Sequence, residues 1–202
     1  MCPDNRMPDT LPQALLTPPP LRGKAVTVRQ IRADDLPAIA RLYADPVFIR
    51  FIPSELWTEP AHATAWLERI EARQNAGEMV QFVIEATDGA GVIGTCLLFR
   101  LDFSAQSAEL GYSLSPAYWG RGLMQEALHL LIDCAFDHFN LRRLEARVDP
   151  RNVRSSKVLA RLGFVHEGCL RECRFLKGEL VDSDLFGLLR REWPPQKPLG
   201  TP

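Results

Sequence analysis

Two glycines flank an arginine in the stretch PAYWGRGLMQEAL, residues 116–128, just before an apolar run with helical spacing. The first turn of a helix leaves about four backbone N–H groups unpaired and carries roughly half a positive charge. Gly120 and Gly122 have no Cβ, so a bulky anion can approach the backbone and the chain can adopt a positive φ. The pattern is typical of a phosphate or pyrophosphate site, with a tight turn as the alternative.

Two common phosphate motifs do not fit this loop. A Walker A loop requires GxxxxGK[ST], which the sequence lacks. A dinucleotide fingerprint would need a third glycine where Gln125 stands, although Glu145 lies about where a ribose-binding acid would be expected. Both motifs are therefore disfavoured.

A strand predicted over SAELGYSLS, residues 107–115, precedes the glycine loop. Its alternation places Leu110, Tyr112 and Leu114 on one face and Glu109 on the other. The sequence thus predicts a carboxylate on the strand that leads into the anion loop.

The other elements follow from periodicity and from glycine, proline and capping residues. Predicted strands cover residues 25–31, 79–86, 91–103, 107–115, 142–149, 164–176 and 180–189. Predicted helices cover residues 33–45, 58–77, 122–139 and 152–164. Thr58 and Asn152 are expected as N-caps, and Gly77 and Gly163 as helix ends. The order β-α-α-β-β-β-α-β-α-β-β indicates an α+β fold.

The chain has 202 residues, a net charge of −1 and 46% hydrophobic residues, which suits one domain. We expect that domain over residues 23–193, after a proline-rich, mostly irregular tail (1–22) and before a C-terminal tail (194–202). The near-zero charge gives no reason to expect nucleic acid or a membrane surface as partner. Without a secretory h-region or a run of about 20 apolar residues, a cytoplasmic location is expected.

Five cysteines occur without a CxxC pair, which favours reduced thiols. Cys169 and Cys173 are expected to pack in the core rather than to act as a reactive pair. The four histidines have no metal-ligand spacing, so no metal is expected.

The segments AELGYSLSPAYWGRGLMQEAL and RRLEARVDPRNVRSSKVLARLGFVHEGCLRE resemble the GNAT acetyltransferase superfamily. The branch that they resemble contains the bacterial ribosomal-protein N-terminal (alanine/serine) acetyltransferases. The resemblance covers nearly the whole predicted domain, and WGRG, N-x-x-S, LGF and EG-x-L-R together are its most specific part. It implies a GNAT-like single domain, with a central mixed, mostly antiparallel sheet flanked by helices. It also implies acetyl-CoA as acyl donor and a primary amine as acceptor.

The superfamily's acyl-CoA motif, Q/R-x-x-G-x-G/A, falls on residues 119–124 and departs from the pattern twice. Trp119 replaces the Gln or Arg, and Met124 replaces the small last residue, where it would narrow the pocket. The coenzyme contacts that the resemblance implies are Leu114, Trp119, Gly120, Arg121, Gly122, Leu123, Met124, Asn152 and Lys157. Arg121, Arg154 and Lys157 are the candidates for the 3′-phosphate, with solvated surface charges as the alternative.

The resemblance also suggests two catalytic residues. Glu109 matches the acid of A-E-x-G-Y, a proposed general base, and Ser155 of N-x-x-S is the candidate proton donor to the leaving thiolate. The alternatives are a surface glutamate paired with arginine and a solvent-facing serine. Many superfamily members carry a tyrosine acid where this chain has Leu159.

Deprotonation chemistry weakly favours an N-terminal amine as acceptor. The pKa of an α-amine is about 2.5 units below that of lysine, which makes its deprotonation easier by roughly 3.5 kcal/mol. A modest carboxylate base therefore suffices for an α-amine. Phe51, Trp57 and Phe175 are candidates to line the acceptor pocket, with core packing as the alternative.

Two other functions remain open at this stage. The acceptor could be a small amine such as an antibiotic, polyamine or amino acid, with Asp182 and Asp184 as acids for an aminoglycoside. The chain could also be a non-catalytic acyl-CoA-binding module. The sequence leaves the oligomeric state open, with a homodimer as one option.

Overall fold

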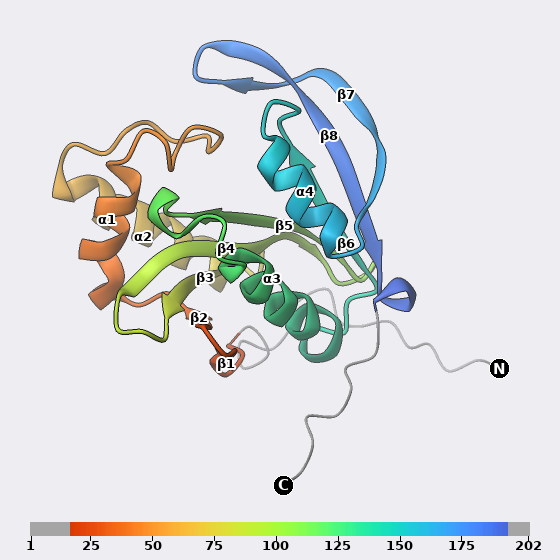
Figure 1. The fold of residues 1–202 in the computed structure, drawn as a ribbon, viewed down its shortest axis with the longest axis horizontal. Coiled ribbons are helices and arrows are strands. Elements are labelled where there is room, and N and C mark those ends of the chain that lie inside the picture. Colours follow the sequence, from red (N-terminus) through yellow and green to blue (C-terminus); the bar gives the residue numbers. More distant parts are fainter. Residues whose placement is uncertain (1–16, 194–202) are drawn as a thin grey trace, which may run out of the picture.

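A single eight-stranded sheet forms the centre of the computed structural model, which describes residues 17–193 (Figure 1). The strands lie in the order β1-β2-β3-β4-β5-β6-β8-β7, and only the β5–β6 pair is parallel. Their bounds are β1 Leu21–Arg22, β2 Val26–Gln30, β3 Met79–Ala86, β4 Gly91–Asp102, β5 Ser107–Leu114, β6 Arg143–Val148, β7 Val165–Leu176 and β8 Glu179–Leu189. The predicted α+β class and the mixed, mostly antiparallel sheet are confirmed.

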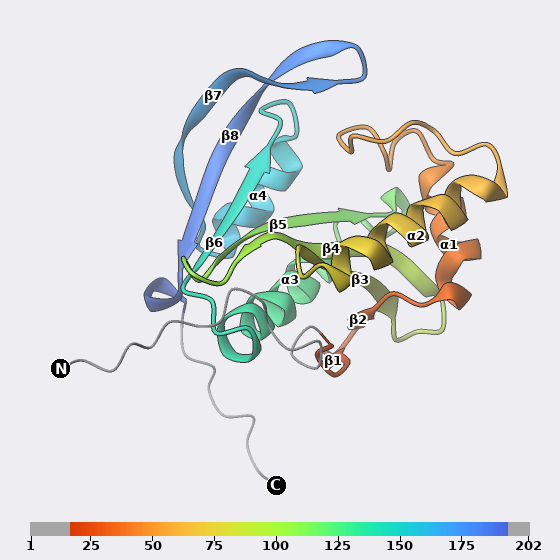
Figure 2. The same cartoon turned by 180° about the vertical axis from the view of Figure 1, so that it is seen from behind.

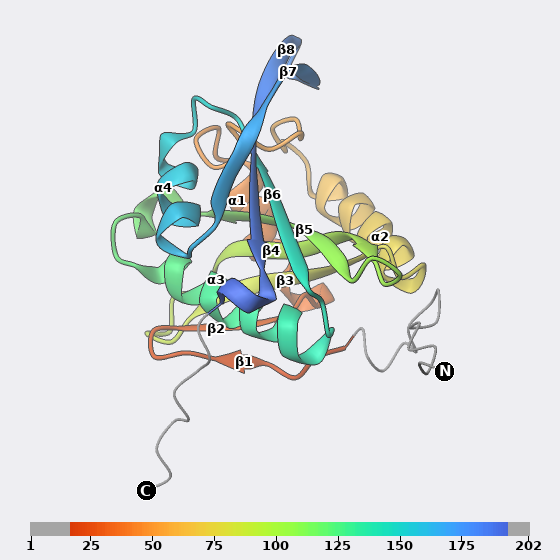
Figure 3. The ribbon, with the colours of Figure 1, turned by 90° about the vertical axis from the view of Figure 1, so that its right-hand side faces the viewer.

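Helices cover both faces of the sheet (Figure 3). They are α1 Leu36–Tyr43, α2 Pro60–Asn75, α3 Leu123–Asp133 and α4 Val153–Arg161. One buried cluster joins the sheet to α3 and α4 and includes Leu128, Leu131 and Leu159, while a second includes Ile39 and Trp66 of α1 and α2. The sheet therefore separates an α3/α4 face from an α1/α2 face.

Three local features differ from the sequence expectations. The strand β1 falls within the segment expected to be irregular. It has only two residues, which is too few to show alternation, and the turn closed by Gly23 N–H and Val26 O (2.8 Å) brings it beside β2. The N-cap of α2 is Glu59 rather than Thr58, since Pro60 begins the helix. The helix expected to reach residue 139 ends in a π-turn, where Phe139 N–H bonds Cys134 O at 3.1 Å.

Two loops meet at one end of the sheet. Lys177, at the tip of the β7–β8 hairpin, donates from Nζ to the carbonyl of Ile49 in the α1–α2 loop at 2.9 Å.

Cys169 and Cys173 of β7 are exposed, so the core packing expected for them is wrong. The reason is that β7 is an edge strand with few buried residues.

No helix within residues 17–193 is long and apolar enough to cross a membrane. In the same range, no three histidine, cysteine, aspartate or glutamate side chains gather as a metal site would require. The predicted tail 194–202, most of the tail 1–22 and Cys2 lie outside the described residues.

Candidate active site

The glycine loop forms an open cradle at the start of α3. Gly120 and Gly122 have φ of 77° and 78°, in the left-handed region, and Gly122 is the N-cap of the helix. A Cβ built on either glycine would meet no heavy atom within 4 Å. Glycine is thus required by the backbone conformation, and the space beside the backbone is open to a ligand.

A run of backbone amides in this loop has no partner among residues 17–193. Among the described residues, none of the N–H groups from Gly120 to Gln125 donates a hydrogen bond; the first helical bond runs from Glu126 N–H to Gly122 O at 3.0 Å. Each such donor contributes about 1.5–3 kcal/mol when it bonds a charged oxygen. The cradle therefore fits a phosphate or pyrophosphate group at a helix N-terminus.

Trp119 ties the cradle to its surroundings. Its indole Nε1–H donates to the carbonyl of Leu114 at the end of β5, at 2.8 Å. The guanidinium of Arg154, on α4, lies 4.5 Å from the Trp119 ring, while that of Arg121 lies 5.1 Å from the Tyr118 ring. Trp119 thus anchors the loop to the sheet and holds a cation of α4 beside the cradle.

The side chain of Met124 lies in the hydrophobic core. The expectation that it would narrow the pocket is wrong, because the first turn of α3 directs this position toward the sheet and away from the open side of the loop.

The strands β5 and β6 diverge beside the cradle (Figure 2). Their parallel pairing covers only three positions and ends at Glu109 opposite Glu145, although β5 continues to Leu114 and β6 to Val148. This gap gives an extended ligand access to the backbone groups of β5. The sequence contained no signal for it, because pairing depends on tertiary contacts.

Glu109 lies at the point where the two strands separate. It is exposed over only 8% of its surface, and its Oε2 lies 2.9 Å from Arg100 Nη1 and 3.4 Å from Arg147 Nε. Burial raises the pKa of Glu109 above its ordinary value, and the two guanidinium groups partly counter that effect. A buried carboxylate with raised proton affinity has the properties of a general base, and it is not the surface glutamate of the alternative.

Ser155 and Tyr112 meet on the opposite face of the sheet. The Tyr112 hydroxyl lies 2.7 Å from Ser155 Oγ and 3.2 Å from the Ser155 carbonyl oxygen. Burial raises the pKa of Tyr112, so its hydroxyl remains protonated. Asn152 caps α4 as expected: its Oδ1 accepts the Ser155 N–H at 3.3 Å. Ser155 is thus held by a helix cap and a tyrosine rather than facing free solvent.

The acceptor candidates divide into two groups. Trp57 packs in the core, where only 8% of its surface is exposed and its ring stacks on Tyr43 with the ring centroids 4.2 Å apart. The expectation that Trp57 lines the acceptor pocket is therefore wrong. Phe51 is half-buried, and Phe175 on the hairpin is 67% exposed. Both remain predictions, as does Lys157, which is exposed on α4.

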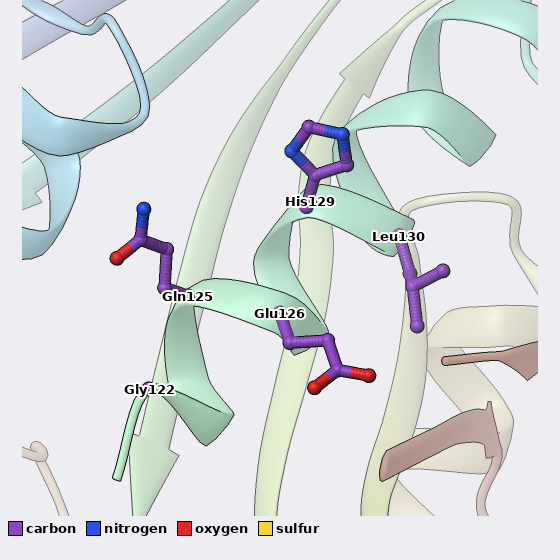
Figure 4. Close-up of a pocket in the computed structure, with 5 residues that line it drawn as sticks. All are labelled: Gly122, Gln125, Glu126, His129 and Leu130. Carbon is purple, nitrogen blue, oxygen red and sulfur yellow. The ribbon is translucent and has the colours of Figure 1, made fainter. Parts of the chain in front are cut away.

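A hollow lies along the first turns of α3, next to the cradle (Figure 4). It is lined by Gly122, Gln125, Glu126, His129 and Leu130. The carboxylate of Glu126 already accepts the N–H groups of Lys24 and Ala25, the latter at 2.9 Å. Glu126 therefore fastens the β1–β2 turn to α3.

Three residues of this site, Tyr112, Arg100 and Arg147, are not predicted by the sequence. Tyr112 was placed on the apolar strand face, although a buried tyrosine hydroxyl usually finds a partner, which was the available signal. Arg100 and Arg147 were not singled out, since nothing local indicates that two arginines from different strands meet on one carboxylate.

The fold, the amide cradle and the strand gap together define the class of protein. A family model described as "Acetyltransferase (GNAT) domain" matches residues 25–165, and the chain belongs to this family of N-acetyltransferases. GNAT enzymes use acetyl-CoA as acyl donor.

Similar proteins agree with this assignment. The chain is 34% identical over 173 residues to "Uncharacterized N-acetyltransferase p20" of Bacillus licheniformis, covering 86% of this chain and 97% of that one. It is 26% identical to the ribosomal-protein-serine acetyltransferase of Escherichia coli over 79% of this chain and 94% of that one. The structure of Mycobacterium smegmatis RimJ in complex with CoA-disulfide superposes with a TM-score of 0.77 at 29% identity, covering 88% of each chain.

Proposed function

We propose that this chain transfers the acetyl group of acetyl-CoA to the α-amine at the N-terminus of a peptide or protein, by direct attack on the thioester. The observation that carries the proposal is the strand gap, which runs along β5 from the buried carboxylate of Glu109 to Leu114, whose carbonyl accepts the Trp119 indole N–H of the cradle loop. The relative that acts on a ribosomal-protein serine supports acceptors that begin with a small residue.

The two faces of the sheet have different roles in the proposed reaction. Glu109 faces the α1/α2 side, where it takes a proton from the incoming ammonium group, directly or through one water. The amine nitrogen then attacks the thioester carbonyl carbon, the carbon–sulfur bond breaks, and the nitrogen loses its second proton to solvent. On the α3/α4 side, the Ser155 hydroxyl gives its proton to the leaving thiolate, and the Tyr112 hydroxyl donates to Ser155 Oγ as negative charge develops there. Solvent returns the proton to Ser155.

The coenzyme is assigned to this chain's own groups. The amides from Gly120 to Gln125 bind the pyrophosphate, and the helix field of α3 adds about 0.3–1 kcal/mol when exposed. Arg154, held against Trp119, is best placed for the 3′-phosphate. The free backbone edges of β5 and β6 hold the pantetheine arm.

The acids considered for an aminoglycoside acceptor are engaged elsewhere. Asp182 Oδ1 accepts the Glu172 N–H at 2.8 Å, and Asp184 Oδ1 lies 3.2 Å from His166 Nε2. Among the described residues, neither carboxylate contacts Glu109. The positions of Asp182 and Asp184 therefore give no support to a small cationic acceptor at Glu109.

Thiol release from acetyl-CoA tests the proposal. The acceptors are a peptide with a free N-terminal serine, the same peptide N-blocked with an internal lysine, and spermidine. We expect thiol release with the free N-terminus and at least tenfold less with the other two, since lysine-type amines are harder to deprotonate by about 3.5 kcal/mol. Turnover of spermidine alone would support the small-amine function. Coenzyme binding by calorimetry without any turnover would support the binding module.

A further inference from the structure

Two arginines from different strands converge on the proposed base. Arg100 reaches Glu109 from β4 and Arg147 reaches it from β6, and both approach the same carboxylate oxygen. Two guanidinium groups therefore face one carboxylate at the point where the acceptor amine must arrive.

The neighbouring carboxylates of Glu145 and Glu167 are bound by a third arginine, Arg143. Glu145, opposite Glu109 on β6, accepts a hydrogen bond from Arg143 Nε at 2.9 Å, and Arg143 also binds Glu167 of β7. Arg143 thus holds these two carboxylates, whereas Arg100 and Arg147 share the single carboxylate of Glu109.

The position of Arg100 depends on a bulge in β4. Residues 100 and 101 oppose the single residue 108 of β5, and pairing resumes at Asp102. Arg100 has φ of 52°, in the left-handed region that a residue with a Cβ adopts only where its surroundings hold it. Bulges commonly redirect a side chain beside an active site, and this one directs Arg100 to Glu109.

Most donors of the two guanidinium groups are unused. Each group carries five N–H donors. Within residues 17–193, Arg100 donates one hydrogen bond to a side chain, to Glu109, and Arg147 donates none. The side chains are 59% and 34% exposed, so the spare donors are open to solvent next to a buried carboxylate.

We propose that Arg100 and Arg147 form a subsite for a carboxylate of the acceptor, so that the enzyme prefers peptide N-termini with an acidic second or third residue. This rests on the proposed function, which places the α-amine at Glu109. Each peptide residue spans at most about 3.3–3.6 Å, so side chains one or two residues from the amine reach groups that contact Glu109. An acceptor carboxylate would give Arg100 and Arg147 a second anion beside Glu109, whereas a lysine or a polyamine would bring another cation against the two guanidinium groups.

The test compares three peptides that begin with serine and differ only in a glutamate, glutamine or lysine at the second position. We expect kcat/KM for the glutamate peptide to exceed that of the glutamine peptide about fivefold to tenfold, with the lysine peptide lowest. The preference should shrink at high salt, because both guanidinium groups are partly exposed. In Arg147→Gln the ratio of glutamate to glutamine peptide should fall toward one.

Arg190→Gln is the matched control, because it removes an arginine bound to Asn140 and Asp137 rather than to Glu109. Its ratio should equal that of the wild type. If Arg147→Gln does not fold, as judged by circular dichroism, the wild-type ratio and its salt dependence decide.

Equal kcat/KM for the three peptides, or a preference for lysine, would overturn the subsite while leaving N-terminal acetylation intact. Acetylation of spermidine with none of the peptides would overturn the proposed function and the subsite together.

Discussion

Replacing Gly122 by alanine isolates the contribution of the cradle to coenzyme binding. Its φ of 78° costs an L-residue about 1–2 kcal/mol, offset by about 0.4–1 kcal/mol from the stiffer unfolded chain. The expected net loss of unfolding free energy is about 1 kcal/mol. The new Cβ would occupy the open space beside six free amides and displace the anion from at least one of them. Losing one charge-assisted hydrogen bond weakens binding by about 1.5–3 kcal/mol, at least about tenfold.

Gly89→Ala is the matched control for this substitution. Gly89 has φ of 88° in the β3–β4 turn, and a Cβ there also meets no atom within 4 Å. Both variants should therefore lose similar stability in denaturant unfolding, and only Gly122→Ala should lose affinity for coenzyme A in titration calorimetry. If Gly122→Ala binds coenzyme A as tightly as Gly89→Ala does, the cradle is not the coenzyme site.

Four further substitutions test catalysis and stability. Glu109→Gln should lower kcat by about 10²-fold or more and abolish the acidic limb of the pH–rate profile, which in the wild type should lie above the ordinary carboxyl pKa near 4.5 because burial raises it. Ser155→Ala should lower kcat with little change in KM, and Tyr112→Phe should do so by a smaller factor. Asp149→Asn should cost about 1–3 kcal/mol at neutral pH in chemical unfolding, because Arg151 binds the Asp149 carboxylate and lowers its pKa. That stabilisation exists above the unfolded pKa near 3.8 and is lost as pH falls through the lower folded value.

Each of these predictions has a control or a contradicting result. Ser156, the next residue on α4, provides the control Ser156→Ala, which should retain wild-type kcat. An unchanged acidic limb in Glu109→Gln would show that another group is the base. If Tyr112→Phe lowers coenzyme affinity as much as it lowers kcat, the Tyr112 hydroxyl has a structural role rather than a role in proton transfer. A stability difference in Asp149→Asn that persists unchanged below pH 3 or so would contradict the assigned ion pair.

Local signals in the sequence were sufficient for most elements of the fold. The start of α3 at a pair of glycines and the cap of α4 at Asn152 depend on the residues beside them, and both were predicted. The strand β1 was not, since two residues that pair only with β2 carry no periodicity of their own.

The parts of the site that sequence could not supply depend on distant contacts. Glu109 and Ser155 could be proposed from motifs, but the gap beside Glu109 exists because β5 and β6 stop pairing. The role of Tyr112 depends on α4 lying above it, and the burial of Trp57 depends on Tyr43 from another helix. Alternation assigns a strand face, but it does not identify the partner of a polar group on that face.

The proposed function requires that the acceptor is an N-terminal α-amine. The most direct measurement offers the purified protein acetyl-CoA and one peptide that carries both a free N-terminal serine and an internal lysine, then locates the acetyl group by tandem mass spectrometry. We expect acetylation at the α-amine, and strongly reduced acetylation by Glu109→Gln. Acetyl groups on the lysine, or an unmodified peptide beside rapid turnover of a small amine, would contradict it.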